Sequence, residues 1–139
     1  MIFDHFKLTN KVAIVTGGTR GIGLSIAHAL GEAGAKIIVT SRTDKYDGLK
    51  SLKDANHDVS FLQGDITNPN EPQKIINSVL EKYNSIDILV NNAGVAQHGT
   101  MEEFDDKLLD KIMNTNVDSV FRMCRSVLPQ MKKQGEGCL

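Results

Sequence analysis

The chain has 139 residues, of which 40% are hydrophobic and 24% charged, and its formal net charge is −1. These values are ordinary for a globular protein, and we expect residues 1–139 to form a single domain. The charge excludes the basic footprint of a protein that binds nucleic acid or anionic membranes. No apolar run has the length of a bilayer span or a signal peptide, so we expect a cytoplasmic protein. The two cysteines lack the spacing of metal ligands, and no metal site is expected.

Short apolar runs alternate with longer amphipathic runs along most of the chain. The apolar runs predict strands at 12–16, 36–40, 59–63 and 87–90. The stretches between them predict helices at 22–33, 46–55 and 70–83, of which the second is weak and polar. Gly34 is expected to follow the end of the first helix. This alternation indicates an α/β fold with a doubly wound parallel sheet.

A long helix is predicted from about residue 105 to residue 134. Its apolar side chains recur at or near every fourth position, at Leu108, Leu109, Ile112, Met113, Val120, Phe121, Cys124, Val127, Leu128 and Met131. Asn116 falls in the same register, where a buried amide needs hydrogen-bond partners. The pattern leaves two interpretations of Asn116 open, a satisfied core residue and a local break in the helix. Residues 135–139 are typical of a helix end and a turn toward a new strand.

The segment between the first strand and the first helix is rich in glycine: Thr16-Gly17-Gly18-Thr19-Arg20-Gly21-Ile22-Gly23. The first turn of a helix has unpaired N–H donors and a partial positive charge, so this unit can hold a diphosphate. Gly17 and Gly21 permit a tight turn close to the ligand, and Gly23 permits close packing of the helix on the strand. A plain structural turn has a similar composition. The position at the start of a βα unit favours a dinucleotide site.

The chain resembles the classical short-chain dehydrogenases/reductases at four points along nearly its whole length. The glycine turn is similar to the family's TGxxxGxG motif, with Thr16, Gly17, Gly21 and Gly23 in the fixed positions. Asp65 looks like the aspartate that hydrogen-bonds the adenine ring. Asn91-Asn92-Ala93-Gly94 resembles the NNAG motif, and Asn116 matches the asparagine of the catalytic tetrad. The resemblance implies a Rossmann-type fold and an oxidoreductase that uses a pyridine dinucleotide.

The resemblance also implies which residues form the site. Asn116 would be the catalytic residue, supporting a water that links the catalytic lysine to solvent. The cofactor would be bound by Gly17, Thr19, Arg20, Gly21, Ile22, Ser41, Arg42, Asp65, Ile66, Asn92, Ala93 and Gly94. From the residues alone, Asp65 also fits a helix-capping or turn aspartate, and residues 91–94 also fit an ordinary turn.

The carboxyl end of the second strand favours NADP(H) over NAD(H). NAD-binding sites place an acidic side chain there, to accept a hydrogen bond from the ribose 2′-hydroxyl. This chain has Ser41 and Arg42 at that position, with Arg20 in the glycine turn opposite. Two guanidinium groups suit a 2′-phosphate. Asp44 is the alternative ribose ligand, and Arg42 also fits a solvated surface charge.

Of the family's catalytic tetrad, only Asn116 has a counterpart in the chain. Tyr46-x-x-x-Lys50 has the family's YxxxK spacing but follows the second strand, beside the adenosine end of the site. We therefore expect a sheet truncated after the fourth strand and the long helix that follows it. An open strand edge at 87–90 would then promote self-association or a homo-oligomer. We also expect the chain to be inactive by itself.

Two functional hypotheses follow. The first is an NAD(P)-dependent oxidoreductase that transfers hydride between NADP(H) and a ketone or secondary alcohol, of the oxoacyl-thioester, sugar or polyol class. The alternative is a non-catalytic fragment that binds a dinucleotide or interacts with intact relatives. In the loop 95–100, which would border the substrate, His98 is either a substrate contact or a solvated residue. Neither hypothesis involves nucleic acid or a membrane.

Overall fold

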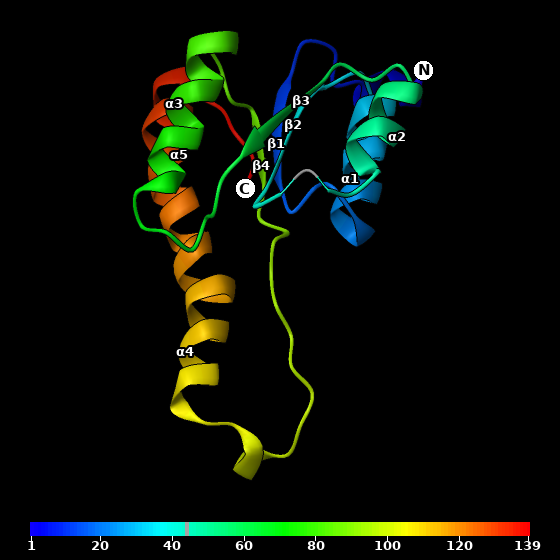
Figure 1. Cartoon of the computed structure of the whole chain (residues 1–139). Helices are drawn as coiled ribbons and strands as arrows, with labels where there is room; N and C mark the ends of the chain where they lie inside the picture. The colour runs from blue at the N-terminus through cyan, green and yellow to red at the C-terminus, as the bar shows by residue number, and fades with distance from the viewer. Residues whose placement is uncertain (44) are drawn as a thin grey trace.

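The computed structural model describes residues 1–43 and 45–139. Within these residues one parallel sheet is formed by β1 (Val12–Thr16), β2 (Lys36–Ser41), β3 (Val59–Gln63) and β4 (Ile88–Val90), in the order β3-β2-β1-β4. Helices α1 (Gly21–Glu32) and α2 (Gly48–Asp54) cover one face, and α3 (Glu71–Tyr83) and α5 (Ser119–Gln134) cover the other (Figure 1). The doubly wound, Rossmann-type sheet predicted from the sequence is thereby confirmed.

Strand β1 is the centre of the sheet, and its register aligns the strand ends. All five of its residues are buried, none more than 2% exposed, as expected for a parallel strand covered on both faces. Val15 pairs with Val39 of β2 and with Val90 of β4. The carboxyl ends of these strands therefore meet at one edge, which is where open α/β sheets bind ligands.

Two apolar layers hold the helices to the sheet. The layer under α3 and α5 includes Ile14, Ile38, Ile76, Leu89 and Met123. The layer under α1 and α2 includes Val15, Ala27, Ile37, Val39 and Leu52. Neighbouring positions of β1 and β2 thus supply opposite layers, because successive side chains of a strand point to opposite faces.

The long helix predicted over 105–134 is interrupted. After α4 (Asp106–Met113) comes a π-helical turn, Asn114–Asp118, and then α5. The buried line of α5 is Ser119, Met123, Val127 and Met131, whereas Phe121 and Leu128 of the predicted stripe are exposed. Short 3₁₀ turns at Ile2–Phe6 and Met101–Glu103 complete the helical elements of the described residues, and none of the helices there is long and apolar enough to cross a membrane.

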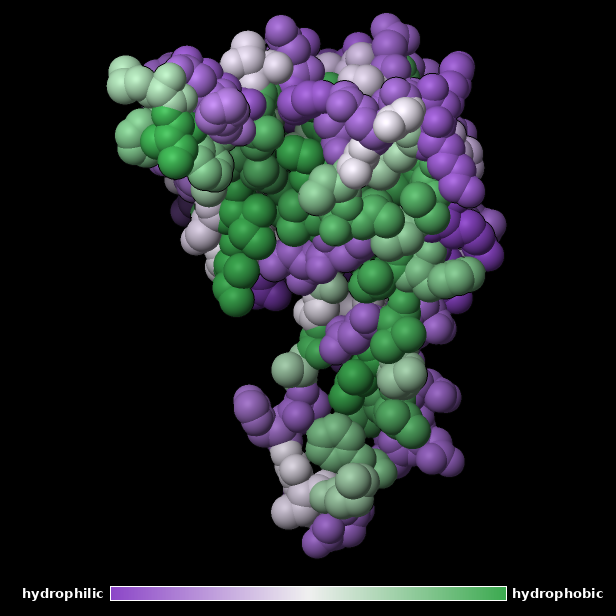
Figure 2. All heavy atoms as spheres, turned by 180° about the vertical axis from the view of Figure 1, so that it is seen from behind, coloured by the Kyte–Doolittle hydropathy of each residue, from purple (hydrophilic) through white to green (hydrophobic). Residues whose placement is uncertain are grey.

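Helix α4 and the loop before it project from the body of the molecule (Figure 1). In α4, Leu109 and Met113 are 52% and 45% exposed, and Val117 of the π-helical turn is 48% exposed. Figure 2 shows hydrophobic side chains along this projecting part. Helix α4 and the π-helical turn therefore expose apolar side chains that the sheet does not cover.

The end of the chain pairs with the outer edge of β4. The Cys138 N–H donates to the Asp87 carbonyl, and the Cys138 carbonyl accepts from the Leu89 N–H, each at 2.9 Å. The expectation of an open edge at 87–90 is therefore wrong at this position, because the backbone turns at Gly135 (φ 77°) and returns to the sheet. The Lys11 ammonium donates hydrogen bonds to the carboxylates of Glu136 and Asp87. These bonds raise the pKa of Lys11 above its ordinary value, and the bond to Glu136 has the larger effect.

Met123 tests how much α5 contributes to stability. Its side chain is fully buried in the layer under α3 and α5. Met123→Ala is expected to lower the free energy of unfolding by about 2–5 kcal/mol, because it removes buried atoms and leaves a cavity. Met113→Ala, at a site 45% exposed, is the matched control and should cost clearly less. Urea denaturation measures both, and equal losses would contradict the assignment of the buried face.

Candidate functional site

The segment between β1 and α1 follows the carboxyl end of β1. Its first residue, Gly17, has a φ of +64° and donates its N–H to the Thr40 carbonyl of β2 at 2.8 Å. Gly21, the first residue of α1, has a φ of +54°, which disfavours a side chain. A β-carbon at Gly21 would meet no protein atom within 4 Å. The structure is therefore open on the Cβ side of Gly21, at the helix end whose first N–H groups lack intrahelical acceptors.

Gly23 allows α1 to approach the polypeptide very closely. A β-carbon there would lie 2.3 Å from Nδ2 of Asn92 and 2.4 Å from the Gly17 carbonyl oxygen. The sequence predicts that Gly23 permits packing of the helix against the strand, and the structure places Asn92, two residues after the end of β4, and the Gly17 carbonyl at that contact. The Asn92 amide donates to the Thr16 carbonyl at 2.9 Å and to the Gly17 carbonyl at 3.2 Å. One side chain thus holds the turn in place.

Thr16 completes the connection between β1 and β4. Its Oγ1 accepts hydrogen bonds from the backbone N–H groups of Asn92 and Ala93, each at 3.0 Å. The Thr16 side chain is 1% exposed, so these bonds are sheltered from water. Ala93 and Gly94 are consequently fixed beside the glycine turn, and a β-carbon at Gly17 would lie 3.1 Å from the Ala93 Cα. The structure therefore brings the glycine turn and the NNAG segment together.

The ends of β2 and β3 supply the polar residues predicted for the adenosine end. Arg42 is exposed, and its carbonyl accepts a hydrogen bond from Nε2 of Gln63 at 3.0 Å. The Arg20 guanidinium lies 4.7 Å from the centroid of the Tyr46 ring, a cation–π distance. Ser41 is half-buried and donates its hydroxyl to the Thr43 carbonyl. Asp44, the alternative ribose ligand, lies outside the described residues.

Asp65 follows β3 and is half-buried. Its Oδ1 accepts from the Thr67 N–H at 3.0 Å and from the Thr67 hydroxyl at 2.6 Å, so the turn interpretation of this aspartate is correct. Oδ2 accepts none of the hydrogen bonds that join the described residues, which leaves it available to an outside donor. The next side chain, Ile66, is 8% exposed and packs in the core, so only its backbone faces the site edge.

Two further predicted residues lie in the glycine turn. Thr19 is 2% exposed, and its carbonyl oxygen lies where a β-carbon at Gly48 would stand, at 1.9 Å. Ile22 is 76% exposed in the first turn of α1. Sequence reasoning missed Gly48, although a glycine at the start of a helix is a signal of close backbone approach.

Asn116 lies in the π-helical turn and is exposed. Its Oδ1 accepts from the Val95 N–H and its Nδ2 donates to the Val95 carbonyl, both at 2.8 Å. The helix-break interpretation is therefore confirmed, and the buried-core interpretation is wrong. A π-helical turn widens the helix locally and is frequent at functional sites. Here it presents the amide to the loop that follows the NNAG segment.

A second bridge to this turn was not foreseen. The Arg122 guanidinium donates to Oδ1 of Asn114 at 2.9 Å and to the Thr67 carbonyl at 3.4 Å. It thereby joins α5 and the π-helical turn to the loop after Asp65. Arg122 is half-buried in the structure, but no local sequence pattern marked it.

Thr16→Val tests the connection between β1 and β4. The substitution keeps the side-chain shape but removes the acceptor of two backbone N–H groups. We expect a loss of about 1–3 kcal/mol in the free energy of unfolding, since the part-buried Ala93 N–H is left without its acceptor and the Asn92 N–H keeps only its bond to the Val90 carbonyl. Thr115→Val is the control, because within residues 1–43 and 45–139 that hydroxyl bonds only to the Lys111 carbonyl of the preceding turn. A Thr16 variant as stable as wild type would show that the connection contributes little.

Comparison with known proteins agrees with this geometry. The family model of the short chain dehydrogenases matches residues 11–139. The 3-oxoacyl-(acyl-carrier-protein) reductase FabG of Vibrio cholerae is 35% identical over 133 residues, which cover 94% of this chain and 53% of the relative.

Solved structures also match nearly the whole of this chain and about half of each similar protein. The crystal structure of gox2181 is 35% identical, with a TM-score of 0.93, and the match covers 99% of this chain and 55% of that one. A gluconate 5-dehydrogenase from Burkholderia cenocepacia, in complex with NADP and tartrate, is 31% identical, with a TM-score of 0.90 and coverage of 99% and 55%. The chain thus spans about half the length of the relatives it matches. It belongs to the short-chain dehydrogenase family.

Proposed function

We propose that residues 1–139 form one domain, the cofactor-binding part of an NADP(H)-dependent oxidoreductase. The observation that carries this proposal is the open first turn of α1, held against the ends of β1 and β4 by Asn92 and Thr16. A helix N-terminus in this position provides fixed N–H donors and a partial positive charge for a diphosphate. In the proposed enzyme, hydride moves between the cofactor and a ketone or secondary alcohol.

The residues present fit a dinucleotide. A β-carbon at Gly21 would meet no atom outside its own helix and chain neighbours within 4 Å, and the first-turn donors there need acceptors. Oδ2 of Asp65 is oriented by the Thr67 bonds to its partner oxygen and would accept from the adenine amine. Ala93 and Gly94 would leave room for the ribose on the nicotinamide side. When bound, the cofactor supplies the hydride, and the chain supplies binding and orientation.

The preference for NADP(H) rests on Arg20 and Arg42. Arg42 follows the end of β2 directly, Arg20 precedes α1 in the turn after the paired strand β1, and a planar guanidinium fits phosphate oxygens with two hydrogen bonds. Stacking on Tyr46 would reduce the freedom that Arg20 loses on binding. The gluconate 5-dehydrogenase with NADP supports the same choice by analogy.

Asn116 would act here as a positioning residue. Both polar atoms of its amide are bonded to the Val95 backbone, so the group fixes the loop beside the nicotinamide end of the site. His98, exposed in that loop, would face a substrate. The names of the relatives include an oxoacyl reductase and a gluconate dehydrogenase, and we propose a substrate of the oxoacyl-thioester, sugar or polyol class. The exposed Phe121 and Leu128 of α5 support a homo-oligomer.

Arg42→Ala tests the cofactor preference. We expect NADPH affinity to fall about tenfold or more, because a charge-assisted hydrogen bond to the 2′-phosphate is lost, whereas NADH affinity changes little. Calorimetric titration of the variant with both cofactors measures the two affinities. Arg125→Ala, an exposed arginine on α5, is the control and should leave both unchanged. An equal fall for NADPH and NADH would exclude Arg42 as the 2′-phosphate ligand.

We expect this chain to bind the cofactor without catalysing the reaction. Of the family's tetrad only Asn116 has a counterpart, so the 139-residue chain should bind NADPH but reduce no ketone above background. Calorimetry and an absorbance assay with NADPH and a panel of oxoacyl thioesters, keto sugars and simple ketones measure the two properties. Turnover well above background would contradict the expected inactivity. Folded chain that binds neither NADPH nor NADH would overturn the proposed function itself.

A further inference from the structure

The outer edge of β3 lies open between α2 and α3. In the described residues β3 pairs with β2 alone. The Asp58 carbonyl accepts from the Ile37 N–H at 2.8 Å, and the Gly64 N–H donates to the Ser41 carbonyl at 3.0 Å. The peptide groups of alternate residues face opposite neighbours in a parallel strand. The N–H and carbonyl groups of Val59, Phe61 and Gln63 therefore point outward, away from the sheet.

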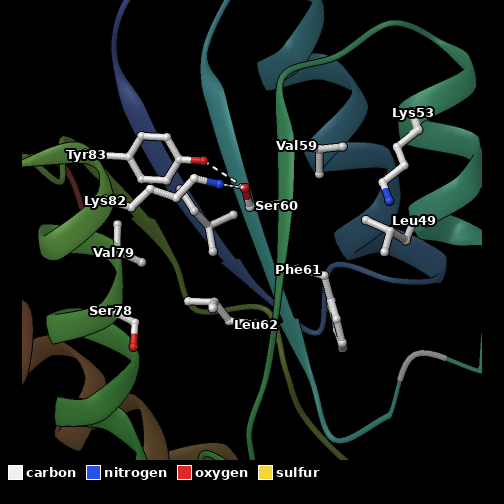
Figure 3. A pocket seen from close by; sticks show the side chains of 11 residues that line it. Leu49, Lys53, Val59, Ser60, Phe61, Leu62, Ser78, Val79, Lys82 and Tyr83 are labelled. Carbon is white, nitrogen blue, oxygen red and sulfur yellow. Dashed lines mark hydrogen bonds between the residues drawn. The ribbon is translucent and has the colours of Figure 1, made fainter.

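A hollow of about 340 Å³ follows this edge (Figure 3). Successive side chains of β3 divide it into two walls, as a pleated strand requires. Ser60 and Leu62 point toward α3, where Val79 adds to the apolar wall. Val59 and Phe61 point toward α2, where Leu49 does the same. An extended chain placed along the edge would find an apolar surface on each side.

The charged groups of the hollow are all positive. Its charged lining residues within the described part of the chain are Lys53 on the α2 side and Lys82 on the α3 side. Nζ of Lys82 donates to Oγ of Ser60 at 2.7 Å, and the Tyr83 hydroxyl lies 2.8 Å from the same oxygen (Figure 3). Three polar groups, the Lys82 ammonium and the Ser60 and Tyr83 hydroxyls, thus gather near the start of β3. A carboxylate would be a stronger partner for Lys82 than the neutral hydroxyl.

We propose that this edge binds an extended, acidic and apolar polypeptide segment as an added strand. Its backbone would bond to the outward groups of Val59, Phe61 and Gln63, and its alternate side chains would cover the two apolar walls. Carboxylates near the start of β3 would pair with Lys53 and Lys82. A second copy of the chain that paired through the same edge fits less well, because the described residues that line the hollow include no carboxylate to meet these lysines. The site begins at the opposite end of β3 from Asp65 and is independent of the proposed cofactor.

The probe is an N-acetylated, C-amidated heptapeptide of sequence EEVIVEE, which presents carboxylates in either strand direction. Its affinity for the whole 139-residue chain is measured by isothermal titration calorimetry, and amide hydrogen exchange is followed by NMR. We expect saturable binding that slows exchange at the outward amides of β3. The basic peptide KKVIVKK should bind at least about tenfold more weakly, because it repels both lysines. The peptide EEVPVEE should also bind more weakly, because proline removes a strand donor.

Charge reversal on the chain provides the matched test. K82E should weaken EEVIVEE about tenfold and strengthen KKVIVKK, and K53E is a second variant should the first fold poorly. K111E, which makes the same change at an exposed position of α4, should leave both affinities unchanged. The proposal is overturned if EEVIVEE binds no better than KKVIVKK, or binds without protecting the β3 amides. Either result would mean that the lysines only prevent other strands from pairing with the free edge of β3.

Discussion

The side-chain amide of Asn92 bonds to the carbonyls of Thr16 and Gly17, while Thr16 Oγ1 accepts the N–H groups that follow β4. This reciprocal connection ties the carboxyl ends of two parallel strands at the point where the strand order reverses. It also occupies the Thr16 and Gly17 carbonyls, which removes two acceptors beside the start of α1. Gly23 is required because a β-carbon there would clash with the Asn92 amide and with the Gly17 carbonyl oxygen. The shape of the site therefore depends on hydrogen bonds within the chain, between Asn92 and the segment Thr16-Gly17, rather than on groups that would bind the ligand.

The remaining parts of the site are held by similar supports, and few side chains are left for direct contact. Asp65 is oriented through Thr67, and the loop after the NNAG segment is fixed by Asn116. Arg122 connects α5 to the loop that carries Thr67, so the helix and the sheet edge are linked by polar bonds as well as by packing. Such supports pre-organise backbone donors before a ligand arrives. With a net charge of −1, attraction for an anionic cofactor is local and depends on the helix terminus and two arginines.

Much of this could be predicted from the sequence. Strand and helix positions followed from hydrophobic periodicity, and the glycine turn and residues 91–94 carried the resemblance. A break at Asn116 was one of two open interpretations, but its π-helical form could not be predicted, because an inserted residue preserves the local apolar spacing while it rotates the helix face that follows. For the same reason the buried line of α5 is Met123, Val127 and Met131, and Phe121 and Leu128 lie outside it. The pairing of Cys138 with β4 and the hollow beside β3 depend on contacts between distant segments, which no local pattern encodes.

The central claim is that backbone N–H groups at the start of α1 bind the diphosphate of a pyridine dinucleotide. Titration of the isotope-labelled chain with NADPH, followed by NMR, tests it most directly. The account predicts that the largest amide shifts occur at Gly21, Ile22 and Gly23, with smaller shifts at Ala93 and Gly94. Saturable binding that leaves those first-turn amides unmoved, or a folded chain that shows no binding, would contradict it.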